Sequence, residues 1–173
     1  RLILREDNAD LRLTTKGREL GLVDDERWTV VETKREAIEL EQQRLRDTWL
    51  QPNKLTDEEA QRVFGKQLAR EYRLLELLSS TDVTYENMRN LPVFGEGVAD
   101  LVVSDQVEIQ AKYAGYIERQ HDEIERHRRH EDTLLPDNLD YARVSGLSNE
   151  VSQKLTKQQP PTIGHAARIP GVT

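Results

Sequence analysis

Apolar residues recur at helical spacing in the first third of the chain. Trp28, Val31, Ile38, Leu45 and Trp49 are three, seven, seven and four positions apart. This spacing places them on one face of a helix and leaves the opposite face to Glu and Arg. The pattern therefore predicts a long helix over about residues 25–50, with Asp24 as its N-cap.

A second long helix is predicted over about residues 105–130, with Ser104 as its N-cap. This segment is apolar on two faces. One stripe consists of Val107, Ala111, Ala114, Ile117 and Ile124, and the other of Ile109, Tyr113 and Tyr116. We expect such a helix to pack between neighbours, and the two long helices to lie antiparallel as in a bundle.

Short helices are predicted around the long ones. The first is capped by Thr14 or Thr15 and ends at Gly21, a residue that suits the left-handed position after a helix. Thr56 and Glu59 form a capping-box pattern for a helix that ends near Gly65. We also expect helices over residues 67–78 and from residue 82 or 84 to before Pro92, followed by a loop over 92–103.

The last third of the chain has its own helix signals. Ser148 is expected to cap a helix that runs to about Lys157 and stops before Pro160. Thr162 is expected to cap a second helix that ends at Ile169. Two short helices joined by a turn predict a hairpin or helix-turn-helix arrangement.

Composition supports an all-α fold. The 173 residues are 36% hydrophobic, 33% charged and 5% aromatic, which indicates a thin core and large solvated helix faces. We expect an elongated helical bundle with two long helices plus a small C-terminal helical subdomain. Because no apolar run approaches the ~20 residues of a membrane span, we expect no membrane association and a cytoplasmic location.

The charge is unevenly distributed along the chain. Residues 1–140 contain 21 basic and 31 acidic residues, whereas residues 141–173 contain 4 basic residues and one acidic residue. We therefore expect a helical domain over 25–140 and a separate C-terminal subdomain over 141–173. The chain begins without Met and ends at Pro-Gly-Val-Thr, a turn toward a further helix, so we expect a fragment of a longer protein.

Several kinds of active site are excluded by the residues present. With no cysteine, the chain has no thiol nucleophile, Cys-ligated metal or disulfide. The Gly95-Glu96-Gly97 segment lacks the third glycine and the preceding strand of a dinucleotide-binding loop. We therefore expect no catalytic residue, no bound cofactor and no metal site in this chain.

The end of the second long helix carries the densest basic patch, Arg126-His127-Arg128-Arg129-His130. Arg126 and Arg129 are candidates for phosphate contact, but basic residues at a helix C-terminus also interact favourably with its dipole. We weigh these two interpretations equally. His121, His127 and His130 have acidic neighbours, yet the interleaved arginines oppose a cation, so a solvated helix end is favoured over a metal site.

The N-terminal block Arg5-Glu6-Asp7-Asn8-Ala9-Asp10-Leu11-Arg12-Leu13-Thr14 is unusually polar directly after an apolar run. A structural polar network and a site facing RNA or a cofactor-bearing domain are equally good interpretations. Trp28 and Trp49 are expected in the core rather than as stacking platforms.

Four blocks, in order, carry a family resemblance. They are Leu4-Arg5-Glu6-Asp7-Asn8-Ala9-Asp10-Leu11-Arg12-Leu13-Thr14 with Gly17 to Trp28, Val107 to Ile117, Leu139 to Val151, and Thr162 to Thr173. Together they resemble the C-terminal region of the MnmG (GidA) family of tRNA uridine 5-carboxymethylaminomethyl modification enzymes. The resemblance covers essentially the whole chain.

The resemblance implies a parent enzyme that binds FAD, uses NADH, forms a homodimer mainly through other regions, and works with the GTPase MnmE on the wobble uridine (position 34) of tRNA. By the same resemblance, residues 1–24 are the junction to a missing N-terminal flavin domain, and an apolar helix follows Thr173. This chain alone is expected to be inactive. Its implied role is to dock MnmE and to help hold tRNA, with a purely structural helical spacer as the alternative.

The resemblance also implies residue roles. Arg5, Asn8 and Arg12 lie in the block nearest the flavin domain, where Arg5 and Arg12 are the expected tRNA phosphate contacts, oriented by Asp7 and Asp10. Arg126 and Arg129 complete the tRNA-binding candidates. The expected MnmE contacts lie in the C-terminal blocks and are Leu147, Asn149, Ile163, Gly164 and Arg168.

Overall fold

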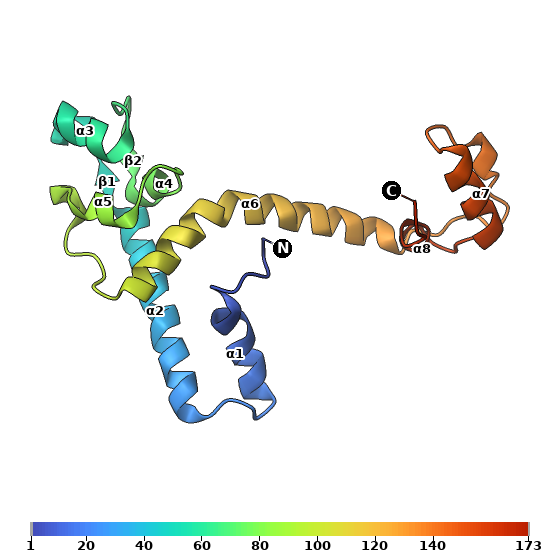
Figure 1. Ribbon diagram of the computed structural model, residues 1–173, viewed down its shortest axis with the longest axis horizontal. Coiled ribbons are helices and arrows are strands. Elements are labelled where there is room, and N and C mark those ends of the chain that lie inside the picture. The colour runs from blue at the N-terminus through green and yellow to red at the C-terminus, as the bar shows by residue number, and fades with distance from the viewer. Residues whose placement is uncertain (1, 173) are drawn as a thin grey trace. The chain divides into compact units, whose positions relative to one another are not determined.

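A computed structural model describes residues 2–172 and divides the chain into two packed units, one up to Ile117 and the other from Glu118 onward (Figure 1). The α-helices are α1 (Ala9–Glu19), α2 (Asp25–Asp47), α3 (Asp57–Phe64), α4 (Leu74–Leu78), α5 (Tyr85–Arg89), α6 (Leu101–Glu131), α7 (Asn149–Gln158) and α8 (Ile163–Ala167). Three short 3₁₀ helices are η1 (Pro52–Lys54), η2 (Pro92–Phe94) and η3 (Tyr141–Arg143). The predicted all-α fold is confirmed.

The described residues contain one small antiparallel ladder. Strand β1 (Trp49–Leu50) pairs with β2 (Tyr72–Arg73), with Trp49 opposite Arg73 and Leu50 opposite Tyr72. The helix predicted over residues 67–78 is therefore wrong in its first half, because the backbone of Tyr72 and Arg73 pairs with β1, more than twenty positions earlier in the chain. The backbone N–H of Leu74 continues the contact by donating to the carbonyl of Thr48 at 3.0 Å.

Side-chain caps begin most helices where the sequence predicts them. The Asp24 carboxylate accepts a 2.8 Å hydrogen bond from the backbone N–H of Arg27. Thr56 and Glu59 form the reciprocal capping box, and Gly65 ends that helix at φ +67°. Thr84, Ser148 and Thr162 likewise cap α5, α7 and α8. Local sequence therefore determines where these helices begin.

Two predicted helix starts are wrong. Helix α1 begins at Ala9, so Thr14 lies buried in its middle instead of capping it. Helix α6 begins at Leu101, because the carboxylate of Asp100 accepts from the backbone N–H of Val102 at 2.8 Å. Ser104 lies in the first turn, and its hydroxyl donates a hydrogen bond to the carbonyl of Leu101.

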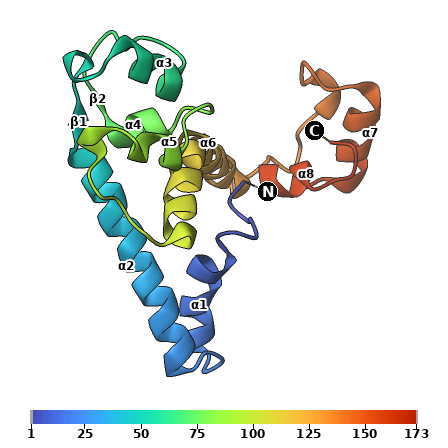
Figure 2. The same cartoon turned by 60° about the vertical axis from the view of Figure 1, so that its left-hand side comes forward.

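The core of the first unit gathers around the predicted stripe of α2. Val31, Ile38 and Leu45 are buried there. Helix α1 packs beside α2 (Figure 2). Trp28 is half-buried, but Trp49 is 47% exposed in β1, with the guanidinium of Arg73 5.0 Å from its ring centroid, so the expectation of a core Trp49 is wrong.

Helix α6 packs in the first unit through its first half only. Val107 and Ala111 are buried there, Ala114 is exposed, and all ten residues from 121 to 130 are exposed. Its first turns cross α2 near the hydrogen bond between Gln42 and Gln110, rather than running antiparallel beside it (Figure 1). The two apolar flanks read from the sequence are therefore not both covered by neighbours within the described residues.

The second unit has a small core of its own, formed by Tyr141, Leu155 and Ile169. An isolated bridge joins Leu134 to Thr162, and the carbonyl of Thr133 accepts from the backbone N–H of Ile163 at 3.0 Å. The second packed unit thus begins at Glu118, earlier in the chain than the change in charge near residue 140. None of the helices in the described part of the chain has the length and hydropathy needed to span a bilayer.

Candidate functional site

Arg5 is held in place by its neighbours. Its guanidinium bonds both carboxylate oxygens of Asp7, at 2.8 and 3.0 Å, and lies 4.5 Å from the ring centroid of Tyr113. The hydrogen bonds to Asp7 raise the pKa of Arg5 and lower the pKa of Asp7. Gln106 also donates to Asp7 at 3.2 Å. As predicted, Asp7 orients Arg5, whose side chain is only 14% exposed.

The other residues of the N-terminal block are arranged differently from the prediction. Asp10 pairs with Lys34 of α2 at 2.9 Å instead of orienting Arg12. Burial opposes ionisation of Asp10, but hydrogen bonds from Lys34 and from the backbone of Leu11 lower its pKa. Arg12 is exposed, and its side chain forms no hydrogen bond or ion pair with any residue from 2 to 172.

The side-chain amide of Asn8 forms a hydrogen bond through its nitrogen but not through its oxygen. Its nitrogen donates to the carbonyl of Ile3 at 3.0 Å. Its Oδ1 is buried and accepts no hydrogen bond from the described residues. A buried acceptor without a partner is uncommon in folded proteins, so this atom marks a place to look for a ligand.

Arg5, Asn8 and Arg12 line an open cleft of about 450 Å³ in the first unit, which we call the arginine cleft. Helices α1, α2, α4 and α6 contribute its walls. Its lining side chains include three arginines, three amides and no carboxylate: Arg5, Arg12, Arg46, Asn8, Gln42 and Gln110, with Ile3, Leu11, Leu75, Ala111, Ala114 and Ile117. The structure thus brings together all three N-terminal candidates and adds Arg46, which the sequence analysis missed.

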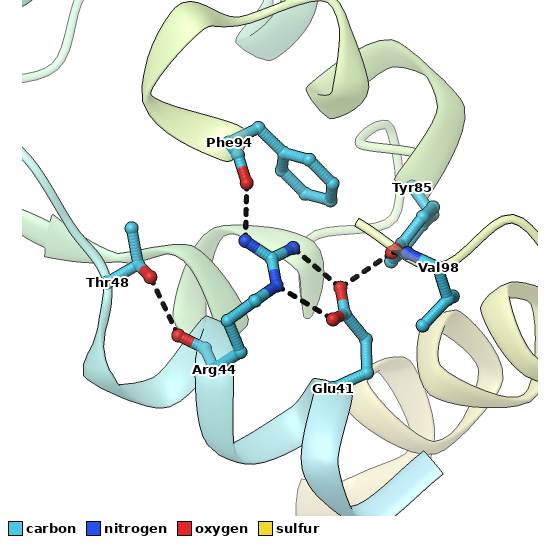
Figure 3. Close-up of polar contacts among 6 residues, drawn as sticks. All are labelled: Glu41, Arg44, Thr48, Tyr85, Phe94 and Val98. Carbon is cyan, nitrogen blue, oxygen red and sulfur yellow. Dashed lines mark hydrogen bonds and ion pairs between the residues drawn. The ribbon is translucent and has the colours of Figure 1, made fainter. Parts of the chain in front are cut away.

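A buried polar network lies elsewhere in the first unit and was also missed (Figure 3). Glu41 is 4% exposed and accepts from Arg44 through both oxygens, at 2.6 and 2.7 Å. Tyr85 donates its hydroxyl to Glu41 at 2.6 Å, and Arg44 also donates to the carbonyl of Phe94. A signal was available: Glu41 occupies the buried face of α2, three positions after Ile38.

This network shifts the ionisation of its members and is satisfied within the chain. Burial, and then the hydrogen bond to Glu41, raises the pKa of Tyr85 to about 12. The hydrogen bonds to Glu41 raise the pKa of Arg44. Because each charged group already has its partner, the network stabilises the fold and leaves no group to bind a ligand.

The second unit carries a different cleft of about 500 Å³, which we call the C-terminal cleft. It is lined by Arg126, His127, His130, Glu131, Ile163, Gly164, Ala167 and Arg168. Arg168 forms an ion pair with Glu131, and Ile163 is 39% exposed. The cleft thus joins three predicted partner-binding residues to one predicted tRNA-binding residue, Arg126.

The remaining candidates lie outside this cleft. Arg129 is 76% exposed and pairs with Glu125 at 3.6 Å. Leu147 packs against the small core around Leu155, and Asn149 is exposed at the start of α7. No group of three metal-ligating side chains occurs among residues 2–172.

Comparison with known proteins assigns the chain to a family. The sequence model for the tRNA modifying enzyme MnmG/GidA C-terminal helical domain matches residues 25–121, and that for the MnmG/GidA C-terminal helical bundle matches residues 123–173. The chain belongs to the MnmG/GidA family. The boundary between the two matches falls in the exposed stretch of α6.

Two solved structures of Aquifex aeolicus GidA agree with this assignment. The form II crystal is 32% identical with a TM-score of 0.61, and the form I crystal is 33% identical with a TM-score of 0.57. Each match covers 98% of this chain. The chain spans about a quarter of the length of these GidA chains, 26% and 25% respectively.

The FAD implied by the MnmG/GidA resemblance does not fit the glycine segment of this chain. A side chain at Gly97 would place its Cβ 2.7 Å from the hydroxyl of Tyr85 and 2.8 Å from the ring of Phe94. Gly97 therefore allows the loop to pack on Tyr85 and Phe94, and this packing takes the space that a phosphate would need beside it. We derive no step of chemistry through a flavin from these residues.

Proposed function

We propose that this MnmG/GidA region holds tRNA and docks the GTPase MnmE within an enzyme that installs a carboxymethylaminomethyl group on the wobble uridine, position 34. The observation that carries the proposal is the presence of two unlike open clefts, one in each unit. The arginine cleft is rich in guanidinium groups, whereas the C-terminal cleft combines apolar residues of α8 with arginine and histidine side chains. Each suits a different partner.

The tRNA role rests on the free cations of the first unit. Arg12 is exposed, and no carboxylate among the described residues neutralises it. A guanidinium in this state is available for charge-assisted bonds to phosphate. Arg5 lies at the same cleft but is committed to Asp7, so we propose that it fixes the cleft wall while Arg12 makes the phosphate contact.

Arg126 and Arg129 are proposed as secondary tRNA contacts from the second unit. Both belong to a stretch of α6 that is exposed along its length. Arg129 is weakly held by Glu125, which leaves it able to exchange that partner for a phosphate.

The docking role rests on the apolar surface of the C-terminal cleft. Ile163 is 39% exposed, and Gly164 keeps the wall of α8 close to α6. Exposed apolar residues beside charged ones are typical of protein interaction sites. We propose that MnmE contacts Ile163, Gly164 and Arg168 there, with Leu147 and Asn149 nearby in sequence.

The remaining parts of the activity are proposed for the longer enzyme. FAD and NADH would be bound by its other segments, which also supply most of the homodimer contacts, and the complex would work in the cytoplasm where tRNA is modified. The chain described here would contribute binding and positioning, not the redox step.

Binding of tRNA to the 173-residue chain tests the first role. We expect Arg12→Glu to weaken binding about tenfold or more in fluorescence anisotropy, and to reduce its salt dependence. Arg62→Glu is the matched control, because Arg62 is also exposed in the first unit but lies away from the arginine cleft. Equal effects of the two substitutions would reject the phosphate assignment.

Calorimetric titration with MnmE tests the second role. We expect Ile163→Asp to abolish or strongly weaken binding, because it introduces a charge into an apolar contact. Val144→Asp is the control, since Val144 has the same 39% exposure and lies outside the C-terminal cleft. If the unaltered chain binds neither tRNA nor MnmE, the region is the structural spacer of the alternative interpretation.

A further inference from the structure

The arginine cleft is positive within an acidic unit. Residues 1–117 contain 17 basic and 23 acidic residues, yet no carboxylate lines the cleft. The side chain of Arg12 has no partner among residues 2–172. Within the same range, the guanidinium of Arg46 bonds only the neutral amide of Gln43, at 2.8 Å. Two guanidinium groups at the cleft are therefore without a counter-charge from the described residues. Such a site attracts an anion.

The cleft also offers an apolar wall, which a bare phosphate or sulfate would not use. Leu75, Ala111, Ala114 and Ile117 line it from α4 and α6. Ala114 is exposed although it belongs to the apolar stripe of α6. Small and branched side chains of this kind leave room for a flat ring.

An amide pair gives this wall a polar edge. Gln42 donates to the Oε1 of Gln110 at 2.8 Å, so each amide has used one group. The Oε1 of Gln42 and the amide hydrogens of Gln110 have no partner within the described part of the chain. An acceptor and a donor side by side match the edge of a nucleobase, which presents both. The buried Oδ1 of Asn8 adds another acceptor at the same cleft.

From these three features we propose that the arginine cleft binds one unstacked nucleotide of a single-stranded RNA. The base lies against the wall formed by Leu75, Ala114 and Ile117, with its edge toward Gln42 and Gln110. Its phosphates lie toward Arg12 and Arg46. A volume of about 450 Å³ falls within the range of small-ligand sites and accommodates one nucleotide.

The inference rests on the proposed tRNA-holding function and makes it more specific. Proteins that recognise RNA by its sequence commonly bind unpaired nucleotides in loops, because only there are the base face and edge free. The cleft would thus engage a loop nucleotide, and the exposed arginines would contact the adjoining backbone.

The test uses the 173-residue chain and a fluorescein-labelled heptamer of uridylate, followed by anisotropy. We expect binding, and we expect Ala114→Trp to weaken it at least tenfold, because the indole occupies the space of the base. Ala142→Trp is the control, since Ala142 is exposed in the second unit and outside the cleft. Thermal unfolding by circular dichroism establishes that both variants fold. Equal affinity of Ala114→Trp and the unaltered chain overturns the proposal.

Arg46→Gln gives a second, independent readout. Loss of one phosphate contact should lower the slope of log affinity against log salt by about 0.7 for a single strand. Arg62→Gln should leave the slope unchanged, because Arg62 is not at the cleft. An unchanged slope with Arg46→Gln contradicts the placement of the phosphate.

Competition identifies the source of the ligand. We expect an oligoglutamate of matched charge to displace the heptamer poorly, and uridine monophosphate to compete only at much higher concentration. Equal competition by oligoglutamate would reassign the cleft to an acidic protein segment, and equal competition by the monophosphate to a free nucleotide. Either result overturns the proposal.

Whole tRNA separates this inference from the broader function. If Arg12→Glu weakens tRNA binding while Ala114→Trp does not, tRNA holding stands and the nucleotide cleft fails. If the unaltered chain binds no tRNA, the proposed tRNA function fails, and the heptamer titration still decides whether the cleft takes a nucleotide.

Discussion

Tyr85 donates its hydroxyl to the buried carboxylate of Glu41 at 2.6 Å, across 44 positions of the sequence (Figure 3). The same hydroxyl accepts from the backbone N–H of Val98 at 2.8 Å. One oxygen atom therefore joins α2, α5 and the loop before α6. The stability of the first unit should therefore depend on the hydroxyl of Tyr85.

Tyr85→Phe removes this oxygen, so the backbone N–H of Val98 loses its acceptor, and Glu41 keeps only its hydrogen bonds from Arg44. We expect the free energy of unfolding to fall by about 1–3 kcal/mol, the usual cost of an unsatisfied buried group. Urea unfolding followed by circular dichroism measures the change. Tyr72→Phe is the control, because the Tyr72 hydroxyl forms no hydrogen bond with the described residues, and it should change stability little. Equal losses would mean that the buried bond is not the cause.

Gly97→Ala should destabilise the same region through the backbone. Gly97 has φ +63°, and an added Cβ would lie 2.7 Å from the Tyr85 hydroxyl. We expect a loss of about 1–3 kcal/mol in the free energy of unfolding. Gly115→Ala should instead raise stability by about 0.5–1 kcal/mol, because Gly115 is helical and its Cβ would meet nothing within 4 Å. Opposite signs for the two substitutions are the expected result.

Asp7 should make stability depend on pH at the acid end. Arg5 lowers the pKa of Asp7 in the folded chain below its ordinary value of 3.8, so the folded state favours the carboxylate. This contribution is fully present above the ordinary pKa and is lost as pH falls through the lower folded value. Urea unfolding from pH 6 to pH 2.5 should therefore show that Asp7→Asn is destabilising near neutrality and that its effect shrinks toward pH 2.5.

The control for this pH dependence is Asp82→Asn. Asp82 is exposed and forms no ion pair with residues 2–172. Its substitution should change the free energy of unfolding little. A constant destabilisation by Asp7→Asn down to pH 2.5 would show that packing, not the charge, is responsible.

Gly164→Ala should open the C-terminal cleft. An added Cβ would lie 2.5 Å from the Cγ and 2.7 Å from the backbone oxygen of Glu131, so α8 must move away from α6. We expect faster hydrogen exchange at the amide of Ile163, which bonds the carbonyl of Thr133, and weaker binding of MnmE. Unchanged exchange and affinity would show that this close approach is not needed.

Local signals in the sequence were sufficient for much of the helical framework. The caps at Asp24, Thr56, Ser148 and Thr162 are side chains that bond the backbone N–H three residues later, so neighbouring residues determine them. The same reasoning missed the strand at Tyr72 and Arg73, because its hydrogen bonds go to residues more than twenty positions earlier.

The candidate binding residues show the same division between what local sequence predicts and what long-range contacts decide. Sequence blocks selected Arg5, Asn8 and Arg12 together, but not which of these side chains is free. That depends on Asp7, Lys34 and Gln106.

The amino-acid sequence by itself therefore determined the all-α class, the family and most helix starts, since these depend on composition, ordered motifs and short-range hydrogen bonds. Folding decided which charges are neutralised and which remain available. Arg5 became part of a wall because it meets Asp7, Arg46 joined the cleft from another helix, and Glu41 became buried because Arg44 and Tyr85 satisfy it. The Arg5–Asp7 and Glu41–Arg44 pairs are local, but Asp7 also meets Gln106, and Glu41 also meets Tyr85. These last contacts, like the arrival of Arg46 at the cleft, join residues far apart in the chain, and no local pattern encodes them.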